Sequence, residues 1–277
     1  MTAVSVLVFT LNEEKNLGAC LDSLEWCDDK FVIDSYSTDR TRDICGERGV
    51  AFVQHAFEGF GKQRNWALQN LDLKYDWVLI LDADERVPPE LSSELGQLAA
   101  ANAPHMGAYR VRRRFYLWGR WLRYSSLYPS WVIRFVHRHK VEYMNRGHGE
   151  TQKVSGEVGE IRGFLIDENL KDLDEWFVRQ IQYARKEAEY ELECEELPWT
   201  IFSVFHSDPL QRRTTLKRIA AALPCRGQIY FLYCYVVRRG FLDGRDGFMF
   251  CRMKAMYQNM IAVEKYDLRK RQNQKLL

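Results

Sequence analysis

The chain has 277 residues, of which 46% are hydrophobic and 28% are charged. This length suits one large domain with an appendage or two small domains, and the apolar content excludes a globally disordered chain. The formal net charge is only +2, but residues 1–100 hold 9 Lys and Arg against 18 Asp and Glu, whereas residues 201–277 hold 15 against 5. The basic end therefore predicts an anionic partner, such as a membrane surface or a nucleic acid.

Cysteine usage and hydropathy predict the compartment. The seven cysteines are odd in number and include no Cys-X-X-Cys pair, which favours buried thiols in a reducing compartment over disulfides or a zinc site. The N-terminal residues do not resemble a secretory signal. The apolar run 229–237 is much shorter than the ~20 residues that span a bilayer. We therefore expect a cytoplasmic protein that is either soluble or peripherally attached to a membrane.

The first hundred residues alternate between strand and helix signals. The pattern predicts strands at 4–10, 31–34, 51–53 and 77–81, and helices at 16–26, from a Ser-Thr-Asp cap at 37–39 to residue 48, at 61–71 and after the two prolines at 88 and 89. This alternation predicts a mainly parallel sheet with helices on both faces. Ligands of such sheets bind beyond the carboxyl ends of the strands, where Asn12, Asp34 and Asp82 fall.

The second half of the sequence has a different pattern. Strands are expected at 109–115 and 131–137, with a loop rich in Tyr, Trp and Arg between them, and a long charged helix at 173–196. Residues 200–266 indicate helices joined by turns at Pro209, Pro224 and 240–247, and the basic segment 269–275 is expected to be frayed. We expect a catalytic domain at 1–165 and a helical C-terminal region at 166–277 that could be membrane-associated.

Two acids follow the strand at 77–81. Asp82 and Asp84 would point to the same side of an extended chain, about 6.5–7 Å apart. Mg²⁺ commonly takes one or two protein carboxylates and completes its shell with water and phosphate oxygens, and such an ion would neutralise a leaving diphosphate. The alternative is a solvated turn. The apolar strand before the pair and the helix start after it favour a functional site.

Other polar groups fall at the same edge of the predicted sheet. The cluster Thr10–Glu14 follows the first strand, although a polar cluster in that position is often only a helix cap. Asp34 follows the second strand and could accept hydrogen bonds from a base or a ribose. Lys62 and Arg64 supply cations near this edge that suit a diphosphate.

The motifs Leu11-Asn12-Glu13, Asp34 with Ser37-Thr38-Asp39, Gly61 to Asn65 and Asp82-Ala83-Asp84 occur in an order and spacing that resemble a family 2 glycosyltransferase. The resemblance implies the GT-A fold, an α/β Rossmann-like domain for nucleotide diphosphate sugars. Within that family the chain is similar to the branch that includes lipopolysaccharide inner-core glucosyltransferases. That branch is further matched by Tyr128-Pro129, Arg134-Phe135, Phe241 to Gly244 and Gly247-Phe248. The resemblance covers most of the chain and is looser beyond residue 150.

The resemblance implies a donor site. Thr10, Asn12, Glu13 and Asp34 would line the nucleotide pocket, with Asp34 near the base, and a UDP-sugar is favoured because such pockets commonly take uracil in this family. Lys62 and Arg64 would steady the nucleotide or the diphosphate.

The resemblance also implies a metal. Asp82 and Asp84 would hold the sugar nucleotide through Mg²⁺ or Mn²⁺, with Asp84 as the direct ligand. Asp82 would reach the ribose or the water shell of the metal.

Enzymes of this family invert the anomeric centre, so they need a base for the acceptor hydroxyl. Glu150 is the first candidate and Asp167 the second. His148 and Arg134 are candidates for contacts to the acceptor or the diphosphate. The alternative for Glu150 and His148 is a surface pair in a glycine-rich turn.

The arginines between residues 110 and 134 alternate with aromatic residues. Such a mixture can stack on nucleic-acid bases, but no nucleic-acid fold signature accompanies it, so no nucleic-acid partner is expected. These residues could contact the acceptor, or the arginines could be ordinary solvated charges, and both interpretations remain open. Residues 219–260 read either as a helical cap or as interfacial helices that meet anionic lipid, and the membrane reading is favoured because a lipid-linked acceptor would require it.

The sequence predicts an inverting transfer of a sugar from a nucleotide diphosphate sugar to a hydroxyl of a glycolipid or lipid-linked glycan. This reaction would belong to cell-envelope polysaccharide or lipopolysaccharide biosynthesis. Two alternatives remain open: a metal-dependent nucleotidyltransferase, and a non-catalytic membrane-associated scaffold with the same fold.

Overall fold

The computed structural model describes residues 2–275 except 147–148, 196–206, 209–211, 213–214, 217–218, 220–222 and 224. The chain forms two compact units. The first comprises Met1–Arg123 and Tyr128–Lys171, and the second comprises Tyr124–Leu127 and Asp172–Leu277. All residues predicted to form the site fall within the sequence of the first unit.

The first half of the first unit is a parallel α/β arrangement, as predicted. Its strands are β1 (Ser5–Thr10), β2 (Asp29–Asp34), β3 (Ala51–Gln54) and β4 (Trp77–Asp82), in the order β3-β2-β1-β4. The helices between them are α1 (Leu17–Asp22), α2 (Thr41–Glu47) and α3 (Phe60–Asn70). Helix α1 ends earlier than expected, because residues 23–26 form turns.

The second half of the sheet is mixed. Helix α4 (Pro89–Ala101) leads to β6 (Met106–Leu117), β7 (Arg120–Trp121), β8 (Ser130–His137) and β11 (Glu157–Glu168). Strand β8 pairs antiparallel with β4 and β6, β11 pairs parallel with β6, and the short β5 (Glu85–Arg86) pairs antiparallel with β11. Within the described part of the chain the sheet has nine strands.

A separate hairpin is formed by β9 (Val141–Arg146) and β10 (Gly149–Val154). The sequence reading predicted β6 and β8 but missed β5, β7, β9, β10 and β11. Strands β9, β10 and β11 carry many charged and polar residues, so they lack the apolar runs that identified β1 and β4.

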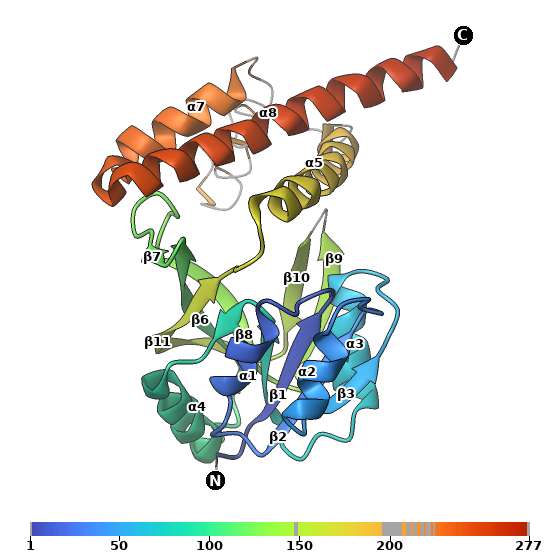
Figure 1. Cartoon of the computed structure of the whole chain (residues 1–277), viewed down its shortest axis with the longest axis vertical. Coiled ribbons are helices and arrows are strands. Elements are labelled where there is room, and N and C mark those ends of the chain that lie inside the picture. Colours follow the sequence, from blue (N-terminus) through green and yellow to red (C-terminus); the bar gives the residue numbers. More distant parts are fainter. Residues whose placement is uncertain are drawn as a thin grey trace. The chain divides into compact units, whose positions relative to one another are not determined.

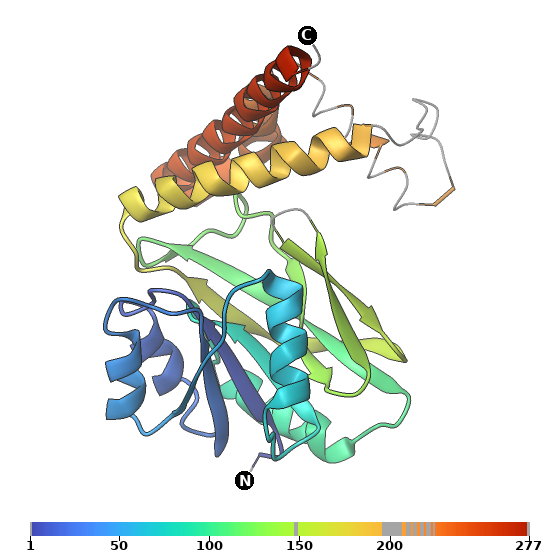
Figure 2. The ribbon, with the colours of Figure 1, turned by 90° about the vertical axis from the view of Figure 1, so that its right-hand side faces the viewer.

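Each face of the sheet has its own hydrophobic core. On one face Val6, Val8 and Leu79 pack with residues of α1, α2 and α4. On the other, Leu7 and Ile80 pack with residues of α3 and β9. Figure 1 shows α1, α2 and α4 beside the sheet, and Figure 2 views the first unit from the side of α3 and the β9–β10 hairpin. The carboxyl ends of β1, β2 and β4 remain at one edge.

The second unit is helical. It contains α5 (Leu173–Glu195), α7 (Arg226–Leu232), a π-helical turn (Tyr233–Val237), a 3-10 turn (Gly240–Asp243) and α8 (Gly244–Lys275). Ala184 and Ala188 of α5 pack against Tyr257 and Ile261 of α8. Among the residues that the structure describes, none of the helices is long and apolar enough to cross a membrane.

Some expectations for the C-terminal half are wrong or untested. The segment 269–275 is not frayed, because α8 continues through Lys275. Cys225 is exposed, whereas Cys20, Cys27, Cys45, Cys234 and Cys251 are buried. The turns expected at Pro209 and Pro224 lie outside the described residues.

Candidate active site

The carboxylate of Asp82, at the end of β4, lies between two buried guanidinium groups. Arg64 Nη2 of α3 is 2.9 Å from Asp82 Oδ1, and Arg134 of β8 donates to Asp82 Oδ2. The side chains of Arg64 and Arg134 are only 5% and 6% exposed. Burial alone would raise the pKa of Asp82, but Arg134 and Arg64 outweigh it and hold that pKa well below its usual value. Asp82 therefore stays ionised.

A bulge in β8 explains how Arg134 reaches this position. Tyr109 of β6 pairs with Phe135, and the next residue, Arg110, pairs with Ile133, so Arg134 is the extra residue. Bulges of this kind redirect a side chain out of the regular alternation. The result is a buried cation beneath the end of β4.

Glu85 continues the ion pairs on the far side of Arg134. Its carboxylate is 1% exposed, lies 3.0 Å from Arg134 Nη2 and accepts a hydrogen bond from the Asp82 amide at 3.0 Å. Arg113 Nη1 of β6 is 3.7 Å from Glu85 and 3.2 Å from Asp167 Oδ2. At the other end, Arg64 Nη1 pairs with Glu150 of β10. Acids and arginines thus alternate in a chain of seven residues: Glu150, Arg64, Asp82, Arg134, Glu85, Arg113 and Asp167.

Among these seven residues, Asp167 is the acid whose pKa lies close to neutral pH. Burial, with the neighbouring acids Asp84, Glu85 and Asp82, outweighs Arg113 and raises the pKa of Asp167 to about 7. The pairing of β5 with β11 creates this environment, because Asp167 lies opposite Glu85 and the Glu168 amide donates to the Asp84 carbonyl at 3.0 Å. A carboxylate with a pKa near neutrality suits proton transfer.

The two acids of the Asp-X-Asp motif have different surroundings. The extended geometry expected for them is wrong, because β4 ends at Asp82 and the backbone turns at Ala83 and Asp84. Asp82 is held by guanidinium groups, whereas Asp84 Oδ2 accepts a hydrogen bond from Asn169 Nδ2 at 3.0 Å. Asp84 is partly exposed. The Asp82 side chain is 37% exposed, so the two acids differ in their partners and not in accessibility, because both oxygens of Asp82 contact arginines.

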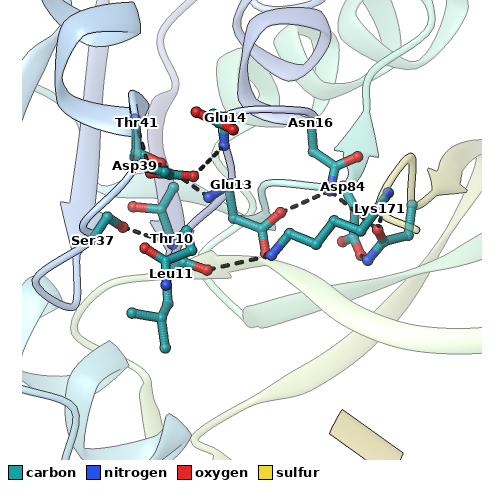
Figure 3. A network of polar contacts seen from close by, with 12 residues as sticks. Thr10, Leu11, Glu13, Glu14, Asn16, Ser37, Asp39, Thr41, Asp84 and Lys171 are labelled. Carbon is teal, nitrogen blue, oxygen red and sulfur yellow. Dashed lines mark hydrogen bonds and ion pairs between the residues drawn. The ribbon is translucent and has the colours of Figure 1, made fainter. Parts of the chain in front are cut away.

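A second polar network joins the loops after β1 and β2 to the segment after β11 (Figure 3). Lys171 Nζ lies 2.7 Å from Glu13 Oε1, and Asn16 Nδ2 donates to Glu13 Oε2 at 2.7 Å. Asn16 also donates to Asn169 Oδ1 at 3.3 Å, and Asn169 in turn donates to Asp84. This network connects Glu13 to Asp84, although they are far apart in sequence.

The Asp34 carboxylate is turned into the protein. The residue is fully buried and accepts hydrogen bonds from Thr10 Oγ1 at 3.1 Å, the Ser37 amide at 2.9 Å, the Ser37 hydroxyl and Gln54 Nε2 at 3.2 Å. Asn12 has a positive φ of 54°, and its Oδ1 accepts the Thr38 amide at 2.8 Å. Asp34 and Asn12 thus fix the loop after β2.

One predicted site residue, Lys62, lies apart from these networks. Lys62 of α3 is 64% exposed at its side chain and pairs with Glu58, which precedes that helix. His148 lies outside the described residues. Glu150 is in strand β10, with its side chain only 12% exposed, so it is not the surface residue of a glycine-rich turn.

The sequence reading missed Glu85, Arg113, Asn169 and Lys171. Glu85 directly follows the predicted acid pair, so its position was a signal. Arg113 is two residues after the buried Val111 on β6, so the two side chains lie on the same face of the strand. Asn169 and Lys171 follow β11, and this strand was not predicted.

The site fits a hard divalent cation. In the part of the chain that the structure describes, no three His, Cys, Asp or Glu residues cluster as a complete metal site. Mg²⁺ and Mn²⁺ do not require one, since one or two carboxylates suffice when water and a substrate diphosphate supply the other oxygens. Asp82 and Asp84 are the carboxylates at this edge of the sheet that could supply such oxygens.

One stability prediction follows from the buried ion pairs. Arg134→Met leaves Asp82 and Glu85 without their shared cation, so we expect the free energy of unfolding to fall by about 3–5 kcal/mol in urea titrations. The matched control is Arg40→Met, which removes an exposed pair with Glu47 and should cost about 0–1 kcal/mol. Equal losses in the two variants would contradict the structural role of Arg134.

The acids and cations lie at the carboxyl ends of parallel strands, which is where α/β domains bind their ligands. The chain belongs to glycosyl transferase family 2, whose family model matches residues 5–167. The predicted family and its GT-A fold are thereby confirmed, and the chain is a family 2 glycosyltransferase.

Two relatives illustrate the match. The chain is 27% identical over 271 residues to the lipopolysaccharide core biosynthesis glycosyltransferase LpsC of Rhizobium meliloti (strain 1021), which covers 95% of this chain and 92% of that protein. It is 31% identical over 111 residues to an uncharacterized glycosyltransferase of Rickettsia bellii (strain RML369-C), which covers 39% of this chain and 37% of that protein.

Solved structures also resemble the chain. Glucosyl-3-phosphoglycerate synthase from Mycobacterium tuberculosis, in complex with Mn²⁺, UDP and glucosyl-3-phosphoglycerate, has a TM-score of 0.43 at 17% identity over 68% of this chain and 80% of that chain. Residues 1–349 of S. aureus TarS have a TM-score of 0.41 at 16% identity over 98% of this chain and 92% of that chain.

Proposed function

We propose that this protein transfers a sugar, with inversion, from a nucleotide diphosphate sugar to a hydroxyl of a glycolipid or lipid-linked glycan. A UDP-sugar is the favoured donor, and cell-envelope polysaccharide or lipopolysaccharide biosynthesis is the setting. The observation that carries the proposal is the arrangement at the end of β4, where Asp82 pairs with two arginines and both Asp82 and the nearby Asp84 are partly exposed. The name of LpsC supports the setting.

The donor side of the proposal divides the work between the two acids. Asp84 would bind Mg²⁺ or Mn²⁺, which when bound would stabilise the negative charge of the leaving diphosphate. Asp82 would orient the site from its clamp, near the ribose or the water shell of the metal. Arg64 is buried against Asp82, so we assign it to Asp82 and leave Lys62 as the exposed cation for phosphate.

The nucleotide would lie over the loops after β1 and β2. Asn12 and Glu13 are in the loop after β1, and their contacts with the loop after β2 and with Lys171 fix the walls of that region. Thr10 and Asp34 would act indirectly, because their hydrogen bonds fix the conformation of the loop after β2. A contact between Asp34 and the base would require exchange of one of its present hydrogen bonds.

For the base we favour Asp167 over Glu150. Asp167 has a pKa of about 7 and pairs with Glu85 where β11 meets β5, so it can accept the proton of a hydroxyl near neutral pH. Glu150 is paired with the buried Arg64, and protonation would break that pair. We therefore assign Glu150 to holding Arg64 in place. Arg134 has the same kind of role toward Asp82, and a contact between His148 and the acceptor stays a prediction.

An apolar surface on the second unit supports a lipid-linked acceptor. Ile229, Leu232, Tyr233, Val236 and Val237 recur at helical spacing and are 40% to 67% exposed. Phe241 and Leu242 follow at 48% and 50%. Exposed apolar residues at this spacing beside arginines are typical of interfacial helices, and residues 201–277 carry the excess positive charge that favours anionic lipid. We propose peripheral contact with the inner face of the cytoplasmic membrane.

The membrane contact predicts a charge-reversal effect. The double variant Val236→Glu and Val237→Glu should reduce co-sedimentation with vesicles of phosphatidylcholine and phosphatidylglycerol by about tenfold, because two carboxylates oppose both apolar burial and the anionic surface. Val178→Glu is the matched control on α5, where the wild-type side chain is 58% exposed. Unchanged binding of the double variant, or binding that ignores the phosphatidylglycerol content, would contradict the contact.

The reaction class is tested by the products. With UDP-sugars and Mn²⁺ the protein should release UDP, and the new glycosidic bond should have the opposite anomeric configuration to the donor by NMR. Release of pyrophosphate would instead identify a nucleotidyltransferase. Absence of any turnover across donors and lipid-linked acceptors would favour a non-catalytic scaffold.

A further inference from the structure

Strand β6 presents a row of arginines on one face. Arg110, Arg112 and Arg114 alternate along the strand, so they share a face that Arg113 does not. Ala108, two residues before Arg110, packs with Ile80 and with α3. Asp82 follows Ile80 by two residues on β4 and is held by Arg64 of α3. The arginine row is therefore on the face of the sheet from which Asp82 is approached.

Aromatic rings hold these arginines in fixed orientations. Arg110 Cζ and Arg112 Cζ lie 5.1 and 5.6 Å from the ring centre of Trp131. Arg114 Cζ lies 3.4 Å from the ring centre of Phe164 and 4.4 Å from that of Trp121. A guanidinium group stacked in this way loses little further freedom when it binds an anion, and its planar donors match phosphate and carboxylate oxygens.

Some N–H groups of these arginines and of Trp121 have no hydrogen-bond acceptor. Arg112 Nε, Arg114 Nε and Trp121 Nε1 are buried without a hydrogen-bond partner. Arg110 pairs with Glu160, and Arg112 donates to the Arg162 carbonyl. For Arg114 the described residues include no carboxylate within ion-pair distance and no hydrogen-bond acceptor. Buried donors without partners are uncommon in native proteins and indicate a missing ligand or solvent molecule.

The position of the cluster relates it to the donor site. Only β8 lies between β4 and β6 in the sheet. Neighbouring strands are about 4.8 Å apart, so the arginine row is ~10 Å from the line of β4. A sugar acceptor whose hydroxyl reaches the region of Asp84 could place a neighbouring acidic group over β6.

We propose that Arg114, with Arg112 and Trp121, forms a subsite for an anionic group, phosphate or carboxylate, on the sugar acceptor. The aromatic rings of Trp121 and Trp131 would contact the sugar, and the guanidinium groups would contact the acidic oxygens. This proposal rests on the proposed function, because it names the chemistry of the acceptor.

The test compares acidic and neutral sugars. Saturation-transfer NMR with mannose 6-phosphate, glucuronate and mannose should show the wild-type protein binding both acidic sugars about tenfold more tightly than mannose. Arg114→Gln should abolish that preference, whereas Arg40→Gln, which alters an exposed arginine of α2's N-terminus, should retain it. Trp121→Phe keeps a ring against Arg114 but removes the indole N–H, so it should weaken acidic-sugar binding by a smaller factor.

The failure of this proposal is distinguishable from that of the proposed function. Arg114→Gln should bind UDP with Mn²⁺ as tightly as the wild type does. If the wild-type protein does not bind UDP at all, the proposed function is overturned, but the subsite is not. Equal binding of mannose and the acidic sugars by the wild type, or a preference that survives Arg114→Gln, would overturn the subsite. Tighter binding of a single-stranded oligonucleotide that Arg114→Gln removes would assign the cluster to nucleic acid and would also overturn it.

Discussion

The Asp84→Asn protein is expected to fold normally and to lose donor turnover by about 10³-fold or more. Asparagine keeps the size of the side chain but removes the charge that would hold Mg²⁺ or Mn²⁺ against the leaving diphosphate, and a tenfold loss corresponds to about 1.4 kcal/mol of barrier. The measurement is the rate of UDP release from a UDP-sugar with Mn²⁺, together with a thermal unfolding curve.

The matched control for Asp84 is Asp76→Asn. Asp76 directly precedes β4, at the end of the strand opposite to Asp84. Its side chain is 61% exposed and interacts with His139. It should keep full turnover. Wild-type turnover in Asp84→Asn, or a loss explained by unfolding, would remove Asp84 from the catalytic account.

Asp167→Asn is expected to lower turnover by about 10²–10⁴-fold, the usual contribution of a general base. The pKa of Asp167 in the folded protein is about 7, so the base form of the wild type is lost as the pH falls below 7. Its kcat/KM should therefore decline about tenfold per pH unit below that value. The residual activity of Asp167→Asn should lack this limb. If Asp167→Asn keeps normal turnover while Glu150→Gln loses it, the base is Glu150.

The same pKa predicts an effect on stability with a defined sign. The folded pKa of Asp167 is raised above its usual value of 3.8, so the folded state holds the proton more tightly than the unfolded state between about pH 4 and pH 7. Stability from this group is present at low pH and is lost as the pH rises through 7. In urea titrations, the free energy of unfolding of Asp167→Asn minus that of the wild type should therefore be larger at pH 8 than at pH 4.

The parallel half of the fold was predictable because its signals are local. Strands β1 and β4 are continuous apolar runs, and the polar motifs follow them directly, so both the sheet and the edge used for binding follow from chain order. The family resemblance rested on these same segments. By contrast, β9, β10 and β11 carry polar side chains on one or both faces, and β11 pairs with β5 and β6, which are distant in sequence.

The connections within the site could not be predicted for the same reason. The sequence indicated that Asp82, Arg64 and Arg134 belong to the site, but it did not indicate that the two arginines clamp Asp82. That clamp depends on a bulge in β8 and on the packing of α3 against the sheet. The environment of Asp167 likewise depends on the two-residue strand β5, which is too short to produce a sequence pattern.

The central claim is that Asp84 and the neighbouring loops bind a nucleoside diphosphate through a divalent cation. Isothermal titration of UDP into the wild-type protein, with Mn²⁺ and then with EDTA, tests it most directly. The account predicts binding with Mn²⁺ that weakens at least about tenfold in EDTA, and equally weak binding by Asp84→Asn in both conditions. UDP affinity that is the same with Mn²⁺, with EDTA and in Asp84→Asn would contradict it.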